Sequence, residues 1–390
     1  MKILIYGVSP WVRSAYGKNC KHIALGLNKL GFEVEVCSYY GIKGESLNYY
    51  DVLVHPCYGD IRASEAWCEY WYKRRNADIV LQHFDTWALS PNWITRRSLP
   101  VVTYAPIDCE PMSSLAIDAM RGALTNVAMS TFVRTQLQRA GLPNTYIPHG
   151  VDTSIYKPMD KTECRKHFGL PPDRFIFGSV STNVSARKNL PNQLKAYKLF
   201  LDMNPGAEKY SVFYLHTAAQ RDELNSQGYD LPKFVNDLDL GLNVVVTDKF
   251  NYYAGYSDEE MAKLYNCFDV LMQCSLGEGF GVPIIEAGAC GVPTIGSDFS
   301  SIPGVMGDGG VKVRTELGIP WQITGVWQRI PVLEDIVDAM SEVFGNEGYK
   351  KTLGEKAYEN AQLYSLDKVL ALWGSLFLSF GRQFGWIKDK

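Results

Sequence analysis

Short apolar runs alternate with amphipathic segments along the whole chain, beginning with the buried-strand pattern of Lys2–Val8. Apolar residues then recur at helical spacing from Cys20 to Leu30 and stop at Gly31. Strands that alternate with helices in this way favour parallel sheets with crossover helices. In this first part the pattern predicts strands at residues 33–39, 51–55, 79–82, 101–105 and 127–130, and helices at residues 65–75 and 132–140.

A second alternating series follows the stretch at residues 147–158. It predicts strands at residues 175–180, 211–216, 244–247, 270–273 and 294–296, and helices at residues 161–168, 194–203, 233–238, 259–268, 284–290, 333–344, 349–363 and 366–380. The expected fold class is therefore α/β with two Rossmann-like domains, residues 1–157 and 158–365, and a carboxyl-terminal helix, residues 366–390. Two such domains are expected to form a cleft between them.

The composition agrees with this division, because 390 residues are too many for one ordinary core. A hydrophobic share of 46% and a charged share of 21% indicate a globular protein. The net charge of −3, from 39 basic and 42 acidic residues, gives no electrostatic reason to expect a nucleic acid partner.

Nine cysteines, an odd number without a C-x-x-C pair, predict neither a disulfide framework nor a zinc site. They favour a reducing cytoplasm. The first apolar run is too short for a signal peptide, and no stretch is long and apolar enough to span a bilayer. We therefore expect a cytoplasmic protein, with peripheral membrane contact as an open alternative.

The most informative motif lies between Cys274 and Asp298, where Glu278 and Glu286 flank a glycine-rich bend eight positions apart. Such a bend, leading into a helix, offers backbone N–H groups and the positive end of a helix dipole to an anion. The carboxylates can accept hydrogen bonds from sugar hydroxyls. The pattern predicts a site for an anionic sugar, and the alternative is a tight turn with two solvated glutamates.

This motif resembles the E-x7-E signature of retaining, nucleotide-sugar-dependent glycosyltransferases with the GT-B fold, and glycosyltransferase family 4 above all. The resemblance covers most of the chain. It implies two domains that face each other across a cleft, with the donor bound to the second domain. It also implies that the terminal helix crosses back to pack on the first domain, through Trp373, Phe377 and Phe380.

The resemblance assigns roles to the motif residues. It implies that Glu278 binds hydroxyls of the transferred sugar and that Glu286 holds the ribose of the donor. The main chain of the bend would help to bind the donor at Gly279, Phe280, Gly281 and Val282.

A basic pair, Arg187 and Lys188, follows the predicted strand at residues 175–180 and precedes a helix. The guanidinium and the ammonium group could pair with the phosphate oxygens of a departing diphosphate. Many relatives carry an arginine five residues before this lysine, where this chain has Asn183, which we also expect at the donor. The alternative is a solvated surface loop.

The first strand-to-helix loop, residues 9–18, lacks the G-x-G-x-x-G spacing of a dinucleotide site. It resembles the glycine-containing loop that faces donor phosphate and acceptor in the family. Gly17 would allow close approach of the donor, and Tyr16 and Arg13 would contact the acceptor. The alternative is a surface loop with a helix cap at Ser14.

Other polar residues give weaker signals. Asp108 follows the strand at residues 101–105, where many relatives have a histidine, and could contact the transferred sugar or the acceptor. His83 and His149 are interpreted as structural, hydrogen-bonded histidines. Asp237 and Asp239 form a D-x-D in an apparently helical stretch and are interpreted as surface residues. No His or Cys cluster suggests a metal, so we expect metal-independent chemistry.

The sequence thus predicts a retaining glycosyltransferase that moves a sugar from a nucleoside-diphosphate sugar to a glycan, lipid-linked or small-molecule acceptor, without a further cofactor. In the family the acceptor attacks on the same face, and the leaving phosphate oxygen takes its proton. A glycosidase also uses two carboxylates, but it needs no phosphate clamp. A nucleotide-sugar epimerase or phosphorylase, and a non-catalytic sugar-nucleotide-binding protein, are the remaining alternatives.

Overall fold

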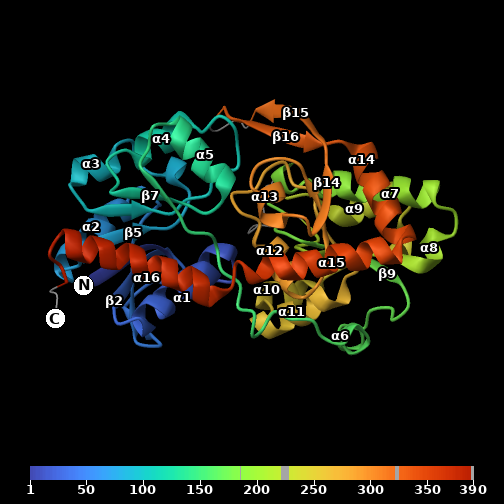
Figure 1. The fold of residues 1–390 in the computed structure, drawn as a ribbon, viewed down its shortest axis with the longest axis horizontal. Coiled ribbons are helices and arrows are strands. Elements are labelled where there is room, and N and C mark those ends of the chain that lie inside the picture. Colours follow the sequence, from blue (N-terminus) through green and yellow to red (C-terminus); the bar gives the residue numbers. More distant parts are fainter. Residues whose placement is uncertain (185, 221–227, 321–324, 388–390) are drawn as a thin grey trace. The chain divides into compact units, whose positions relative to one another are not determined.

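The computed structural model describes residues 1–184, 186–220, 228–320 and 325–387. The chain forms two compact units (Figure 1). The first unit comprises Met1–Gly150 and the segment from Ser365, and the second comprises Val151–Pro320 and Trp327–Tyr364. The second unit begins before the expected boundary at residue 157, because the Val151 N–H donates to the Tyr364 carbonyl at 2.9 Å and buried Tyr156 donates to Asp258 at 3.0 Å.

The first unit contains an eight-stranded sheet in the order β3-β4-β2-β1-β5-β6-β7-β8. All neighbouring strands run parallel except β3, which pairs antiparallel with β4. The strands are β1 (Lys2–Val8), β2 (Glu33–Tyr40), β3 (Leu47–Tyr49), β4 (Val52–Pro56), β5 (Ile79–Gln82), β6 (Val101–Thr103), β7 (Thr125–Ala128) and β8 (Asn144–Tyr146).

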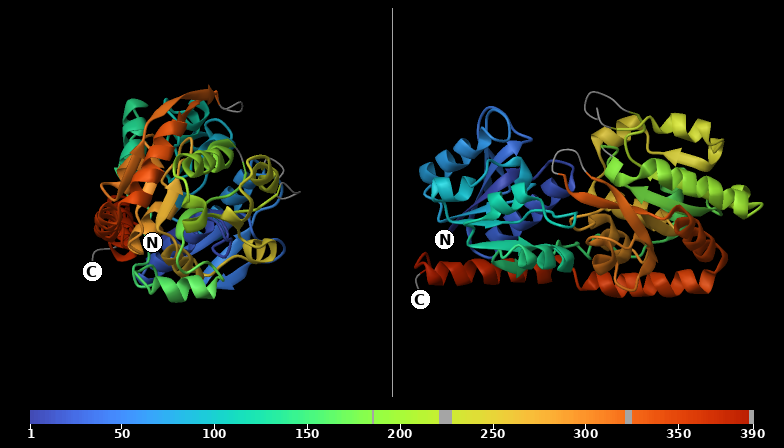
Figure 2. Two further views of the ribbon diagram at one scale, coloured as in Figure 1. Left: turned by 90° about the vertical axis from the view of Figure 1, so that its right-hand side faces the viewer. Right: turned by 90° about the horizontal axis from the view of Figure 1, so that it is seen from above.

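Helices of the first unit pack on this sheet and on one another. They are α1 (Ala15–Lys29), α2 (Ser64–Arg74), α3 (Trp93–Arg97), α4 (Ser114–Met120), α5 (Thr131–Arg139) and α16 (Leu366–Gln383), with a short 3-10 turn at Thr86–Ala88. Helix α16, red in Figure 2, lies against α1, so closely that a Cβ on Gly26 would come within 2.3 Å of Leu370. Trp373 and Phe377 are fully buried on α16, whereas Phe380 is only half-buried.

The second unit contains an all-parallel six-stranded sheet in the order β11-β10-β9-β12-β13-β14. A separate antiparallel pair, β15 with β16, completes its strands. The strands are β9 (Phe175–Val180), β10 (Ser211–His216), β11 (Val244–Val246), β12 (Val270–Gln273), β13 (Thr294–Ser297), β14 (Gly310–Val313), β15 (Thr315–Pro320) and β16 (Trp327–Pro331).

A core built on buried Phe177, Phe200, Phe213 and Met340 joins this sheet to its helices. The helices are α6 (Lys161–His167), α7 (Leu190–Met203), α8 (Ala207–Tyr210), α9 (Leu231–Asp237), α10 (Lys249–Ala254), α11 (Asp258–Cys267), α12 (Val282–Ala289), α13 (Ile302–Met306), α14 (Leu333–Gly345) and α15 (Glu347–Gln362), with 3-10 turns at Ala186–Lys188 and Gly241–Asn243. The predicted α/β class with two Rossmann-like domains is confirmed.

Candidate functional site

The glycine-rich bend connects β12 to α12, as the motif predicts. Gly281 has φ of 96° at the start of α12, a conformation that residues with a Cβ rarely adopt. Pro283 occupies the first turn of the helix, where a missing N–H removes no helical hydrogen bond. The bend therefore begins the helix immediately after the loop that carries Glu278.

The Glu278 carboxylate lies between the two predicted cations. Its Oε1 accepts a hydrogen bond from Lys188 Nζ at 2.6 Å, and its Oε2 accepts one from Arg187 Nη1 at 2.8 Å. Arg187 Nη1 also donates to the Gly277 carbonyl at 2.8 Å. Carboxylate, ammonium and guanidinium groups thus form one ion cluster from two loops that lie about 90 residues apart in sequence.

This cluster fixes the ionisation of Glu278. Burial would raise the pKa of its carboxyl group, but the charges of Lys188 and Arg187 outweigh burial and lower the pKa to about 2. Glu278 is therefore an anion at neutral pH. It can accept hydrogen bonds and cannot donate one.

Backbone hydrogen bonds hold the two loops together. The Leu276 N–H donates to the Arg187 carbonyl at 2.8 Å, and Asn189 Nδ2 donates to the Cys274 carbonyl at 3.0 Å. Ser300, from the loop after β13, accepts a hydrogen bond from the Glu278 N–H at 2.9 Å. The cluster therefore lies at the carboxyl ends of β9, β12 and β13, the edge where open α/β sheets bind their ligands.

Two other predicted donor residues lie in different surroundings. Glu286 is buried on α12 and accepts a hydrogen bond from the Tyr265 hydroxyl of α11 at 2.8 Å. Asn183 is buried and donates from Nδ2 to the carbonyls of Ala218 and Tyr229, at 3.0 and 2.7 Å. The Asn183 amide therefore holds two stretches of backbone, and its predicted contact with the donor stays a prediction.

The remaining residues of the bend pack into the unit. Gly279 receives a hydrogen bond on its carbonyl from Ser301 Oγ at 2.6 Å. The Phe280 ring is buried edge-on against Tyr364, and Val282 is half-buried in the first turn of α12. Donor binding by the main chain of the bend stays a prediction.

Sequence reasoning missed Gln273, the last residue of β12. Its Nε2 donates to Glu278 Oε1 at 3.1 Å, while its buried Oε1 has no hydrogen-bond partner among the described residues. A polar side chain at the end of an otherwise apolar strand was the available signal. Gln273 thus binds the same carboxylate oxygen of Glu278 as Lys188 does.

In the first unit, the loop at residues 9–18 leads into α1 with a helix cap. Ser14 accepts a hydrogen bond from the Gly17 N–H at 3.2 Å and caps α1, as in the alternative interpretation. The Tyr16 hydroxyl donates to Asp85 Oδ2 at 2.8 Å, and Arg13 is exposed. A Cβ at Gly17 would lie 2.0 Å from the Val12 carbonyl oxygen, so Gly17 is required by packing within the loop.

His83 and His149, the two histidines of this unit that the sequence singles out, are buried and neutral. His83 Nδ1 lies 3.0 Å from the Tyr104 carbonyl, which can only accept, so His83 Nε2 accepts from Asn19 Nδ2 at 3.3 Å. His149 Nδ1 receives hydrogen bonds from Asn19 and, at 2.8 Å, from the Tyr104 hydroxyl. Burial lowers the pKa of His83 to about 4 and that of His149 well below its usual range. Both residues are structural, as interpreted from the sequence.

Three further aspartates that the sequence singles out lie outside the ion cluster. Asp108 is half-buried in the segment between β6 and α4, and α4 begins only at Ser114. Asp237 ends α9 and pairs with Lys233, and Asp239 follows it in an exposed turn. Within residues 1–184, 186–220, 228–320 and 325–387, no three His, Cys, Asp or Glu side chains gather as metal ligands. No helix in the described part of the chain is both long and apolar enough to cross a bilayer.

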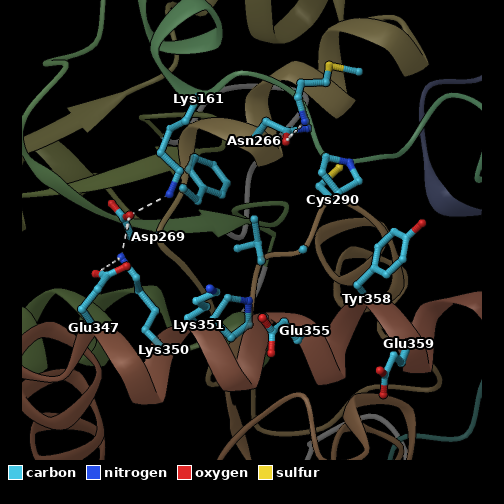
Figure 3. Close-up of a pocket in the computed structure, with 17 residues that line it drawn as sticks. Lys161, Asn266, Asp269, Cys290, Glu347, Lys350, Lys351, Glu355, Tyr358 and Glu359 are labelled. Carbon is cyan, nitrogen blue, oxygen red and sulfur yellow. Dashed lines mark hydrogen bonds and ion pairs between the residues drawn. The ribbon is translucent and has the colours of Figure 1, made fainter.

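A cavity of about 490 Å³ lies elsewhere in the second unit (Figure 3). Its walls include Asp269, Pro293 and Lys350. Asp269 directly precedes β12 and Pro293 directly precedes β13, so this cavity lies at the edge of the sheet opposite the Glu278 cluster. No residue that the sequence predicts for the site lines it.

Comparison with known proteins finds similarity to glycosyltransferases. Residues 239–360 match the family model described as glycosyl transferases group 1. This segment is therefore similar to a group 1 glycosyltransferase domain. The predicted resemblance is confirmed at this level, and the matched segment includes both Glu278 and Glu286.

Curated relatives match mainly over part of their length. A D-inositol 3-phosphate glycosyltransferase from Stackebrandtia nassauensis is 25% identical over 202 residues, which is 51% of this chain and 44% of the relative. An N-acetyl-alpha-D-glucosaminyl L-malate synthase from Bacillus anthracis is 23% identical over 58% of this chain and 46% of the relative. The chain thus spans about half the length of these relatives.

Solved structures match over nearly the whole chain. The sucrose-phosphate synthase of Thermosynechococcus elongatus has a TM-score of 0.79 at 15% identity and covers 98% of this chain and 100% of its own. HepE of Anabaena, solved with UDP-glucose, has a TM-score of 0.72 at 16% identity. The match covers 97% of this chain and 100% of the HepE chain. These similarities show the GT-B fold, as the sequence predicts.

Proposed function

We propose that the protein is a retaining glycosyltransferase that transfers a sugar from a nucleoside-diphosphate sugar to a hydroxyl-bearing acceptor. The observation that carries the proposal is the ion cluster of Glu278, Lys188 and Arg187 at the carboxyl edge of the second sheet. Lys188 and Arg187 supply two positive charges where a diphosphate would leave. HepE, which shares the fold, was solved with UDP-glucose, and this agrees with a nucleotide-sugar donor.

The ionisation of Glu278 favours transfer over glycoside hydrolysis. A glycosidase needs one carboxylic acid with a raised pKa to protonate the leaving group. The pKa of Glu278 is lowered to about 2, so it has no proton to give at neutral pH. Its carboxylate is suited to accept hydrogen bonds from the hydroxyls of the transferred sugar.

The proposed reaction balances without a protein nucleophile. The bond between the anomeric carbon and the diphosphate oxygen breaks, and the acceptor oxygen bonds to the same face of that carbon. The acceptor proton passes to the leaving phosphate oxygen. Lys188 and Arg187 stabilise the charge that develops on the diphosphate, a role that a divalent cation has in other transferases, and we therefore propose metal-independent transfer.

We assign the donor to the second unit and the acceptor to the first. Glu286 is the proposed ribose ligand. The hydroxyls of a bound ribose would compete with the Tyr265 hydroxyl for the Glu286 carboxylate. Arg13, Tyr16 and Asp108 are the proposed acceptor-side residues. Glycans, lipid-linked sugars and small molecules are the acceptor classes to test.

The test is turnover of UDP-, GDP- and ADP-sugars by the purified full chain, measured with and without EDTA. Lys188→Ala should lower kcat/KM by about 100-fold, the typical effect of removing one donor that stabilises transition-state charge. Lys198→Ala is the matched control, since Lys198 pairs with Asp202 on the surface of α7. It should leave turnover unchanged.

Stereochemistry and variants decide the remaining alternatives. Retention is checked by NMR of the anomeric proton of the product. Donor binding without turnover over an acceptor panel would support the sugar-nucleotide-binding alternative, and equal activity of Glu278→Ala and the wild type would contradict the proposal.

A further inference from the structure

Three cysteines from three elements of the first unit meet in its core. Cys37 belongs to β2, Cys57 directly follows β4, and Cys68 belongs to α2. The Cys37 and Cys57 sulfur atoms are 3.0 Å apart, and both thiols are free. Cys37 is fully buried, whereas the exposed fraction of Cys57 is 7%.

The backbone around this pair is already fixed. Strands β2 and β4 are parallel neighbours, and the Cys57 N–H donates to the Ser38 carbonyl at 2.8 Å. A disulfide has an S–S length of about 2.05 Å, so each sulfur needs to move only about 0.5 Å.

We propose that Cys37 and Cys57 form a dithiol that oxidises reversibly to a disulfide within the folded protein. The inference is independent of the proposed transferase activity. It assigns to two of the nine cysteines a role that the sequence does not predict, because the odd count and wide spacing suggest no pairing.

The chemistry balances with a small-molecule disulfide such as glutathione disulfide as the oxidant. The Cys57 thiolate attacks it, forms a mixed disulfide and releases one glutathione thiolate. The Cys37 thiolate then attacks the Cys57 sulfur and releases the second. The two cysteine protons pass to the two glutathiones. Burial raises the pKa of the Cys37 thiol, so the second step should be slow.

The bond would have a structural effect. It closes a loop between residues 37 and 57 and ties the ends of β2 and β4 together. Restricting the unfolded chain in this way stabilises the folded state, so the oxidised protein should melt at a higher temperature. Ser38, next to Cys37, is hydrogen-bonded through its hydroxyl to Ser9 at 2.8 Å, where the loop at residues 9–18 begins.

The experiment uses the native full chain, incubated with glutathione disulfide and then alkylated in denaturant. Trypsin places Cys37, Cys57 and Cys68 on three separate peptides, residues 30–43, 44–62 and 63–73. The expected product is a cross-linked pair of the first two peptides, lighter by two hydrogen atoms, that dithiothreitol releases. The oxidised chain should also lose its higher melting temperature on reduction.

Two variants complete the test. Cys57→Ser should abolish the cross-link and the melting shift, whereas Cys20→Ser, at another fully buried cysteine of the same unit, should change neither. A cross-link from residues 30–43 to residues 63–73, or one that forms only in denaturant, would overturn the proposal. The same holds if native protein incubated with the oxidant keeps all its thiols.

Discussion

Gly17 lies in the first turn of α1, directly against the main chain of Val12. A Cβ there would be 2.0 Å from the Val12 carbonyl oxygen, which is backbone and cannot rotate away. We expect Gly17→Ala to cost about 3 kcal/mol of unfolding free energy, at the upper end of overpacking effects, because the loop must shift. The measurement is urea unfolding of the variant against the wild type.

Gly348→Ala is the matched control for this substitution. Gly348 also lies in the first turn of a helix, α15, and its added Cβ would make only an ordinary contact at 3.6 Å. It should be neutral or slightly stabilising, since alanine favours the helix more than glycine does. Equal stability of the two variants would show that the loop adapts without cost.

Single residues also show why the site is only partly predictable. Glu278 and Glu286 are equivalent in the motif, but Glu278 faces two cations and Glu286 faces a tyrosine. The partner of Glu286, Tyr265, comes from another helix, whose packing the local sequence does not encode. Asn183 is likewise occupied by carbonyls from residues 218 and 229, which its own neighbours in sequence do not indicate.

At the scale of elements, Asp269 connects α6, α15 and β9 of the second unit. Its buried carboxylate accepts hydrogen bonds from Lys161 of α6 at 2.7 Å and Lys350 of α15 at 3.2 Å (Figure 3). It also accepts hydrogen bonds from Arg165 of α6 at 2.7 Å and the Ile176 N–H of β9 at 2.8 Å. Removing one partner of a buried ion pair leaves charge without compensation. We expect Asp269→Ala to lower the free energy of unfolding by about 3–5 kcal/mol, as measured by urea unfolding.

The pH dependence of this contribution has a definite sign. Burial would raise the pKa of Asp269, but the charges of Lys161, Lys350 and Arg165 lower it below its usual value. The contribution is therefore fully present above the unfolded pKa of about 3.9 and is lost as the pH falls through the folded value. Asp335→Asn, which breaks an exposed pair with Arg314, should have a much smaller effect. Similar losses in both variants would contradict this account.

The elements themselves were predictable where burial is strong. The apolar runs gave Lys2–Val8, Ile79–Gln82, Phe175–Val180, Ser211–His216 and Val270–Gln273 with the bounds that the structure has. Strands such as β3, β15 and β16 were missed because they are short or carry exposed residues, such as Leu317 on β15. An exposed hairpin has little of the hydrophobic periodicity on which such predictions depend.

At the scale of the whole molecule, three histidines make stability depend on pH, of which His83 and His149 are buried and His216 is half-buried. Burial lowers the pKa of His83 in the first unit and of His216 in the second to about 4, and lowers that of His149 well below its usual range. The unfolded chain binds these protons near pH 6.5, whereas the folded chain does not. Stability is therefore unaffected above pH 6.5 and falls as the pH decreases toward about 4. At pH 5, His83 and His216 should each lower the free energy of unfolding by about 2 kcal/mol.

Variants separate this effect from general acid sensitivity, because only a histidine that stays neutral in the folded state contributes to it. Urea unfolding at pH 7.5 and pH 5 gives the loss of unfolding free energy between these pH values for each protein. His83→Gln removes one titrating group and should reduce the loss by about 2 kcal/mol, whatever its effect on stability at pH 7.5. His167→Gln, at an exposed position of α6, should leave the loss unchanged. If His83→Gln and the wild type lose the same stability between these pH values, His83 is protonated in the folded protein and its buried, neutral assignment is wrong.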